Sequence, residues 1–392
     1  MVLNLVADRI VQDKMYPALA RHRAEPYTQS WREFEQHWPC TVPFRPQEYL
    51  AKANIPVNIY TVDSFPDHCY YPIGLGFFNF GIDYFDLLPP LVFDAVLDGR
   101  LKLLFYYHEG DNPVDIKSRL HQLTSVHGLD PNCYVFVSGN TAAAAVENFV
   151  YFPDFELWYY HRNRNVNALT VHNQPRERDF ACLNRLHKSW RATVTADLVR
   201  SGVLDNSYWS YCETGPLDDQ DNPIEIDTVS ELRTYTQQFL AAGPYVSDEL
   251  SQSERNNHAN LEPKYFANAY CNIVMETHFD VDQSGGAFLT EKTFKPIKHG
   301  QMFFVAGGAG SLQQLRNLGY RVFDHVLDNS YDCIQNNTLR WQALRTAIAQ
   351  AKPQLPQLFA AAQADMVHNQ QLFLSHQPQR LNTLIEKLYE YR

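Results

Sequence analysis

Basic side chains gather where one predicted strand turns into a helix. The apolar run Phe180–Leu183 predicts the strand, and Asn184, Arg185, Lys188 and Arg191 follow it closely. A basic side chain at the start of a helix opposes the helix dipole unless an anion is bound there. We therefore predict a turn that binds a diphosphate. The alternative is a solvated basic surface that faces acidic neighbours.

A second turn with similar chemistry is predicted at Thr290-Glu291-Lys292. Thr290 is a potential N-cap for a short helix over Lys292–His299, which Gly300 can end. The exposed amide groups of a helix start, together with Lys292, would attract phosphates and ribose hydroxyls, and Glu291 suits the positive end of the dipole. The alternative is that Glu291 and Lys292 only cap the helix and keep its surface polar.

The elements around these turns alternate between strands and helices, which predicts an α/β fold built from Rossmann-like domains. The predicted strands are Val57–Val62, Leu101–Tyr107, Asn132–Ser138, Glu156–Tyr160, Phe180–Leu183, Tyr208–Tyr211, Asn268–Glu276, Met302–Ala306 and Tyr320–Asp324. The predicted helices are Leu91–Leu97, Pro113–Val126, Ala142–Phe149, Ala192–Ser201, 228–240, Lys292–His299, Asn336–Ala351, Gln357–Leu374 and Gln379–Tyr389. The glycines at 307, 308 and 310 predict a turn where the backbone can come close to a ligand or to another helix.

The region around Thr290 resembles the donor-binding signature of GT-B glycosyltransferases, and most closely the α-1,3-fucosyltransferase-like family. That family carries Glu-Asn-Ser, then Thr-Glu-Lys, then a helix, a strand similar to Val-Pro-Val and a glycine. The matching pieces here are Ile273–Thr277, Thr290–Lys292 and Phe303–Val305. Thr277 stands where the family has Asn. The resemblance implies a glycosyltransferase that moves a sugar from a nucleoside-diphosphate sugar to a glycan or another hydroxyl acceptor.

The resemblance also implies two Rossmann-like domains with a cleft between them and a helical C-terminal tail. We expect an acceptor domain over residues 1–165, a donor domain over 166–355 and helices over 356–392 that pack back on the body, since the polar segment His161–Asp179 fits an inter-domain connection. The family has an Asn and an Arg at the turn that matches Asn184 and Arg185. The expected donor-binding residues are Asn184, Arg185, Lys188, Arg191, Glu276, Thr290, Glu291 and Lys292.

Two carboxylates follow the predicted strand Leu101–Tyr107, at the end where ligands bind in open α/β sheets. If the transfer inverts configuration, as we expect, a carboxylate of the first domain must accept the proton of the acceptor hydroxyl. Glu109 is the first candidate, Asp111 comes next, and His108 has a weaker claim. The alternative for both carboxylates is that they cap the helix that begins after them, which Asn112 could also do.

Asp83 is a further candidate base, and it lies in the stretch Tyr70–Phe85, which is dense in Tyr, Phe and Gly. We expect this stretch to be a loop that packs over a cleft or stacks on a sugar. The alternative is that its aromatic residues form core.

Composition excludes several classes of protein. The formal net charge of −11 leaves no overall basic field to attract nucleic acid or anionic lipid. Seven cysteines occur singly and without a Cys-x-x-Cys pair, which favours a reducing compartment. No apolar run reaches membrane-spanning length, and the first residues lack the pattern of a signal peptide, so we expect a cytoplasmic protein.

Other functions compete with the leading one. The chain could be a non-catalytic protein that binds a nucleotide or a carbohydrate on the same fold, or a transferase that glycosylates a hydroxymethylated nucleic-acid base. Asp280-Val281-Asp282 resembles the Asp-x-Asp that binds manganese in the other large glycosyltransferase fold. Two domains and the Glu-Lys turn favour the metal-independent type, in which the helix dipole and basic side chains replace the cation. We therefore expect no metal, and no cofactor besides the donor itself.

Overall fold

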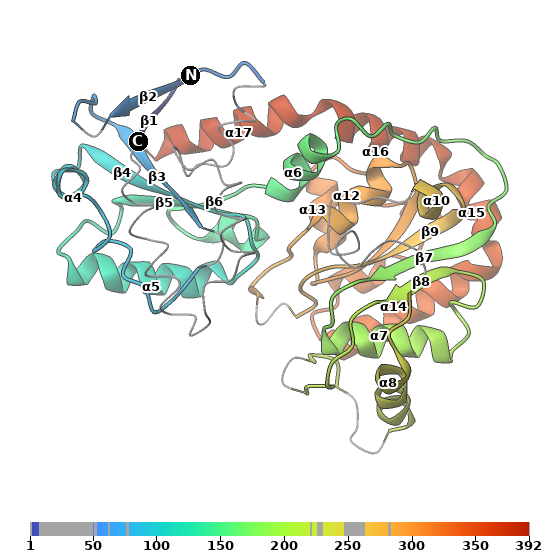
Figure 1. Cartoon of the computed structure of the whole chain (residues 1–392). Coiled ribbons are helices and arrows are strands. Elements are labelled where there is room, and N and C mark those ends of the chain that lie inside the picture. The colour runs from blue at the N-terminus through green and yellow to red at the C-terminus, as the bar shows by residue number, and fades with distance from the viewer. Residues whose placement is uncertain are drawn as a thin grey trace. The chain divides into compact units, whose positions relative to one another are not determined.

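The computed structural model describes most of the chain as two compact units (Figure 1). Unit 1 comprises Met1–Asp154 and His376–Arg392, and unit 2 comprises Phe155–Ser375. The chain thus changes unit at Asp154, ahead of the expected boundary at 165/166, and the expected tail 356–392 is divided between the units. The described residues are 2–7, 50, 53–61, 63–75, 78–219, 222–225, 230–246, 263–280 and 284–391.

Unit 1 contains a six-stranded parallel sheet in the order β2-β1-β3-β4-β5-β6. Its central strands are buried along nearly their whole length, which is why they read as continuous apolar runs in the sequence. The rings of Phe105, Phe136 and Phe149 stack in the core beneath them. The strands are β1 (Leu3–Ala7), β2 (Val57–Thr61), β3 (Cys69–Leu75), β4 (Leu101–Tyr107), β5 (Tyr134–Ser138) and β6 (Phe149–Tyr151).

The last helix of the chain belongs to unit 1. Tyr70 donates a hydrogen bond from its hydroxyl to the backbone oxygen of Leu388 (2.6 Å), and the Lys102 ammonium donates to the backbone oxygen of Tyr391 (2.5 Å). These bonds fasten the helix to strands β3 and β4. Within the described part of unit 1, the helices are α4 (Pro90–Leu97), α5 (Pro113–Val126), the 3-10 helix η1 (Thr141–Ala145) and α17 (Gln377–Glu390).

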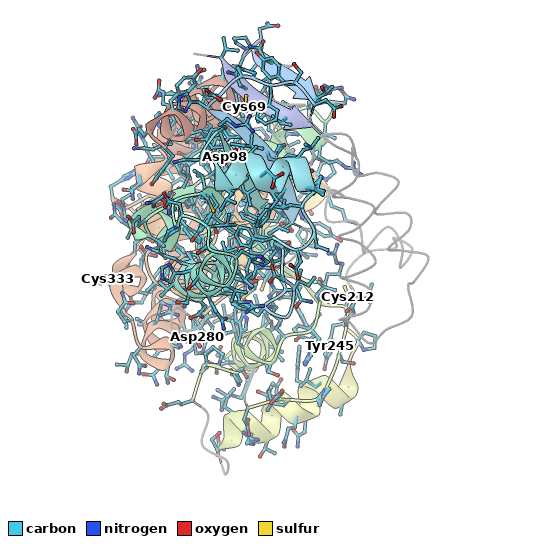
Figure 2. The ribbon with its side chains drawn as sticks, turned by 90° about the vertical axis from the view of Figure 1, so that its left-hand side faces the viewer. Cys69, Asp98, Cys212, Tyr245, Asp280 and Cys333 are labelled. Carbon is cyan, nitrogen blue, oxygen red and sulfur yellow. The ribbon has the colours of Figure 1, made fainter. Side chains whose placement is uncertain are left out.

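Unit 2 contains a four-stranded parallel sheet in the order β10-β9-β7-β8. Its strands are β7 (Arg178–Asn184), β8 (Tyr208–Tyr211), β9 (Ala269–Met275) and β10 (Met302–Ala306). An antiparallel bridge joins Tyr211 at the end of β8 to Tyr245, so that Cys212 and Tyr245 lie close together (Figure 2).

The helices of unit 2 surround this sheet (Figure 1). Two of them position the candidate site. Helix α7 (Ser189–Arg200) follows β7, and helix α12 (Glu291–Lys298) precedes β10. The others are α6 (Asp154–Arg162), α8 (Glu231–Ala242), α10 (Pro263–Ala267), α13 (Ser311–Asn317), η2 (Ser330–Cys333), α14 (Asn337–Ala351), η3 (Lys352–Gln354), α15 (Leu355–Ala361) and α16 (Gln363–Ser375).

Two predicted elements near the unit boundary are wrong. The segment Glu156–Tyr160, predicted as a strand, lies in helix α6, where the buried residues recur three positions apart, Asp154 with Leu157 and Glu156 with Tyr159. The predicted helix Ala142–Phe149 is only the short 3-10 turn η1, because strand β6 already begins at Phe149.

The predicted strand Tyr320–Asp324 is also wrong. Tyr320, Val322 and Phe323 are apolar and buried, but the side chain of Asn369 on α16 pairs with both polar groups of the Arg321 backbone. The Arg321 amide donates to the Asn369 side-chain oxygen (2.8 Å), and the Asn369 amide group donates to the Arg321 oxygen (2.7 Å). A side chain therefore replaces the neighbouring strand that the sequence pattern suggested.

Candidate functional site

The carboxyl ends of β7 and β9 mark the point where the strand order of unit 2 reverses. Strand β8 lies on one side of β7, whereas β9 and β10 lie on the other. Ligands of open parallel sheets bind outside the carboxyl ends at such a switch point, because the connections there leave in opposite directions. Asn184 and Arg185 end or follow β7, and Glu276 follows β9. This edge therefore carries the residues predicted to bind the donor.

Glu276 fixes the start of α12 beside the end of β9. It is completely buried. Its Oε1 accepts from the Thr290 amide (3.0 Å) and the Thr293 hydroxyl (2.5 Å). Its Oε2 accepts from the Thr290 hydroxyl (2.6 Å) and the Thr277 amide (3.2 Å). Because protein donors engage both oxygens of this buried carboxylate, Glu276 positions the start of α12, and its contact with a donor stays a prediction.

Thr290 is the N-cap of α12, as predicted. Its hydroxyl donates to Glu276 and accepts from the Lys292 amide (3.4 Å). Glu291 lies in the first helical turn, and its carboxylate pairs with the Lys292 ammonium at 3.0 Å. The Lys292 ammonium also reaches the hydroxyls of Thr290 (3.2 Å) and Thr277 (3.3 Å), while its side chain stays 31% exposed. Lys292 is thus held by α12 and still faces solvent.

The basic residues at the start of α7 tie this helix to the chain after β9. The Arg191 guanidinium is buried and donates twice to the backbone oxygen of Glu276, at 3.2 and 2.5 Å. The Lys188 ammonium donates to the backbone oxygen of Thr277 at 2.9 Å. Both side chains therefore hold the start of α7 against the chain that follows β9, and they add positive charge at the switch point.

Arg185 interacts electrostatically with Glu291 at the start of α12. Burial lowers its pKa, and the carboxylates of Glu291 and Glu213 oppose that effect. Arg191 of α7 bonds the Glu276 backbone and the Glu276 carboxylate bonds Thr290, so the two predicted turns are brought together in unit 2. Burial first, and then the basic side chains around it, lower the pKa of His278 to about 4, so this imidazole is neutral at pH 7.

Asn184 offers a buried acceptor at this edge. Its side chain is 3% exposed, and its amide nitrogen donates to the Thr195 hydroxyl at 3.2 Å. No described residue donates to its side-chain oxygen, which is shielded from solvent. Because an unsatisfied buried acceptor costs free energy, such an atom suits a site that a ligand donor completes.

Arg340 and Gly307 are hydrogen-bonded at the carboxyl end of β10, the strand next to β9. Arg340 is fully buried and donates to the backbone oxygens of Gly307 (3.2 Å) and Ile334 (2.8 Å), and it also bonds the Phe279 oxygen. A Cβ on Gly307 would lie 3.3 Å from the Glu276 Cβ. The glycine turn thus makes room for Glu276. Nothing in the local sequence around Arg340 predicts this role.

The start of α13 is occupied by a side chain of the protein. The Asp332 carboxylate accepts from the amides of Leu312 and Gln313, both at 2.9 Å. The predicted approach of a ligand to the turn before α13 therefore has no support in the structure.

In unit 1, the carboxyl ends of β4 and β5 carry a second polar group. Asn112 is the N-cap of α5, so neither Glu109 nor Asp111 caps this helix. Glu109 is 38% exposed and lies 3.4 Å from the imidazole of His108. Asp111 accepts a hydrogen bond from the Tyr107 hydroxyl, and burial raises the pKa of that hydroxyl. Glu109 is the more accessible of the two carboxylates.

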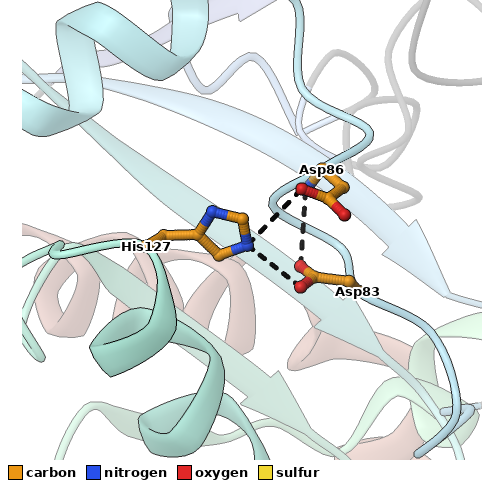
Figure 3. A group of neighbouring side chains, drawn as sticks. All are labelled: Asp83, Asp86 and His127. Carbon is orange, nitrogen blue, oxygen red and sulfur yellow. Dashed lines mark hydrogen bonds and ion pairs between the residues drawn. The ribbon is translucent and has the colours of Figure 1, made fainter.

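Asp83 does not join Glu109 and Asp111. It pairs with His127 at 3.0 Å (Figure 3), and its other oxygen accepts from the Phe85 amide. His127 ends α5, whereas Asp111 precedes its start, and a helix of 14 residues is about 21 Å long. Asp83, the further candidate base, is therefore separated from Glu109 and Asp111 by the length of α5.

Asp83, Asp86 and His127 each place one ligand atom within 4.8 Å of the others (Figure 3). Such a set is compatible with a cation, but both Asp83 oxygens already accept hydrogen bonds within the protein. The other acidic motif is only partly described. Asp280 accepts from the Asn337 side chain at 3.0 Å, while Val281 and Asp282 lie outside the described residues.

His299, at the end of α12, gives unit 2 an acid-sensitive site. It is 2% exposed, no described residue bonds either ring nitrogen, and burial together with Lys298 lowers its pKa to about 3. The unfolded imidazole has a pKa near 6.5, so the unfolded state binds more protons below that pH. The free energy of unfolding should therefore fall as pH drops from about 6.5 towards 3, by up to about 1.4 kcal/mol per pH unit.

We expect His299→Leu to reduce this loss, since leucine can fill the site without a proton to bind. Urea midpoints between pH 7.5 and 4.5 measure the effect, with the exposed His172→Leu as the control. If the urea midpoints of wild type and His299→Leu fall equally as the pH drops, groups other than His299 cause the loss of stability in acid.

Comparison of the chain with protein-family models gave no match, and comparison with curated proteins gave none. Among the described residues, no helix has both the length and the apolar character needed to span a membrane.

Proposed function

We propose that this protein is a metal-independent glycosyltransferase of the GT-B type, similar to the α-1,3-fucosyltransferase-like family. It would move a sugar from a nucleoside-diphosphate sugar to a hydroxyl acceptor with inversion of configuration. One observation carries the proposal: Asn184, Arg185 and Lys292, which come from separate parts of the sequence, gather at the switch point between β7 and β9.

The charge of this group supports a diphosphate ligand. Five basic side chains face two carboxylates, Glu276 and Glu291, and a third, Glu213, acts on Arg185. The excess of about two positive charges matches the diphosphate of a nucleotide sugar, and helix start α12 adds its dipole. The basic side chains are Arg185, Lys188, Arg191, Lys292 and Lys295.

The parallel sheets in both units support the GT-B assignment. Each sheet has a switch point, between β1 and β3 in unit 1 and between β7 and β9 in unit 2. We assign unit 2 to the donor and unit 1 to the acceptor, as two Rossmann-like domains. In this arrangement, basic side chains and a helix start take the place of a metal ion.

The proposed reaction places charge where this site can stabilise it. The acceptor oxygen attacks the anomeric carbon, the bond from that carbon to the phosphate oxygen breaks, and the diphosphate leaves with the electron pair. Arg185 and Lys292 stabilise the growing negative charge in the transition state. The Glu109 carboxylate takes the proton of the acceptor hydroxyl, with His108 as its neighbour. The buried oxygen of Asn184 accepts from a donor hydroxyl.

Loss of a basic side chain tests the binding step. We expect nucleoside diphosphates to raise the melting temperature of the wild type in the presence of EDTA. Arg185→Ala and Lys292→Ala should weaken this binding on the order of 10- to 100-fold, because each removes a charged hydrogen-bond partner. A thermal-shift titration with uridine and guanosine diphosphates measures it.

Arg178→Ala is the matched control, because Arg178 begins the strand that Arg185 follows and lies at the opposite edge of the sheet. Equal binding by the Arg185 and Arg178 variants would contradict the proposed site. Binding that needs a divalent cation would contradict the metal-independent assignment.

A further inference from the structure

Lys295 is a basic residue of α12 to which sequence analysis assigned no role. It follows Glu291 by four positions and Lys292 by three on the same helix. Residues at these spacings share one face of a helix. Lys295 therefore lies on the side of α12 that carries the predicted donor-binding residues.

The three lysines of α12 differ in their partners. Lys292 pairs with Glu291, and the Lys298 ammonium donates to the backbone oxygen of Asn163 at 2.7 Å. Lys295 is half-buried, yet its ammonium makes no hydrogen bond or ion pair with any described residue. A partly desolvated ammonium with no partner is unfavourable, and it gains stability when an anion binds to it.

The surroundings of Lys295 contain both signs of charge. Glu291 and Glu276 act on it with negative charge, whereas Lys292 and Arg185 act with positive charge. Burial first, and then these cations, lower the pKa of Lys295 to about 8. Since Glu276 is fully hydrogen-bonded and Glu291 already pairs with Lys292, neither carboxylate is available to neutralise Lys295 completely.

We infer that the Lys295 ammonium is a direct contact for the diphosphate, and that it completes the group formed by Arg185 and Lys292. This inference rests on the proposed function, because it places Lys295 in the donor site. A bound phosphate oxygen would give Lys295 the partner that no described residue supplies, and it would offset the repulsion among the three cations.

The test compares Lys295→Met with Lys264→Met. Lys264 is an exposed residue of α10, which precedes β9 and so lies at the opposite edge of the sheet. Both changes remove one positive charge and keep an unbranched side chain. The probes are inorganic pyrophosphate and uridine and guanosine diphosphates, titrated by calorimetry in EDTA.

We expect Lys295→Met to bind pyrophosphate and the preferred nucleotide at least 10-fold more weakly, with Lys264→Met unchanged and Lys295→Arg close to wild type. The melting temperature of ligand-free Lys295→Met should equal or exceed that of wild type, which separates lost binding from lost folding. If wild type binds and Lys295→Met binds equally well, the role of Lys295 is wrong while the donor site stands. If wild type binds none of the probes, both proposals are wrong.

Discussion

Glu109→Gln is expected to lower the rate of sugar transfer by roughly 10²- to 10⁴-fold, the usual contribution of a general base. The amide keeps the size of the side chain but cannot take a proton from the acceptor hydroxyl. Nucleotide affinity should not change, because the donor residues belong to unit 2 and Glu109 to unit 1. Initial rates with the best nucleotide sugar of a panel, together with calorimetric binding of its nucleotide, measure both effects.

Two further carboxylate variants make this test specific. Asp111→Asn should have a smaller effect, because Asp111 already accepts the Tyr107 hydroxyl. Asp83→Asn should leave the rate unchanged, because Asp83 lies at the other end of α5. Sugar transfer by Glu109→Gln at the wild-type rate would show that Glu109 is not the general base. Nucleotide binding without turnover by the wild type would favour the non-catalytic alternative.

Glu276→Ala is expected to lower the free energy of unfolding of unit 2 by roughly 3–5 kcal/mol, since loss of a buried, fully engaged charge leaves several buried donors without an acceptor. These donors are the amides of Thr290 and Thr277 and the hydroxyls of Thr290 and Thr293. Together they hold the start of α12 against β9. The change should therefore weaken nucleotide binding as well as stability.

Urea unfolding followed by tryptophan fluorescence suits this measurement, because four of the six tryptophans lie in unit 2. Glu231→Ala on α8 is the control, since its side chain is 96% exposed and surface changes usually stay within about 0.5 kcal/mol. Similar urea midpoints for the two variants would contradict the positioning role of Glu276.

Signals that act over a few residues allowed good predictions. The cap residues Thr290 and Asn112, the strand Met302–Ala306 and the strand Leu101–Tyr107 all lie where the sequence placed them. In each case the signal is a cap or an apolar run that depends on its own neighbours. The position of Arg185 near the start of α12 follows from the neighbouring positions of β7 and β9 in the sheet, an order that was not predicted from the sequence.

Features that depend on distant partners could not be predicted. Asn369 replaces a strand beside Arg321, and no local pattern reveals such a pairing. The stretch Tyr70–Phe85 suggested a loop because it is dense in aromatic residues and glycine, but its first part belongs to the strand β3. The positioning role of Glu276, and the position of the Lys295 ammonium, which no described residue bonds, also arise only when β7, β9 and α12 meet.

A crystal structure with a bound nucleoside diphosphate is the most direct test of the central claim. We expect phosphate oxygens within about 3.2 Å of the Arg185 guanidinium and the Lys292 ammonium, outside the carboxyl ends of β7 and β9. Density for the diphosphate at another edge of the sheet, or in contact with neither side chain, would contradict it.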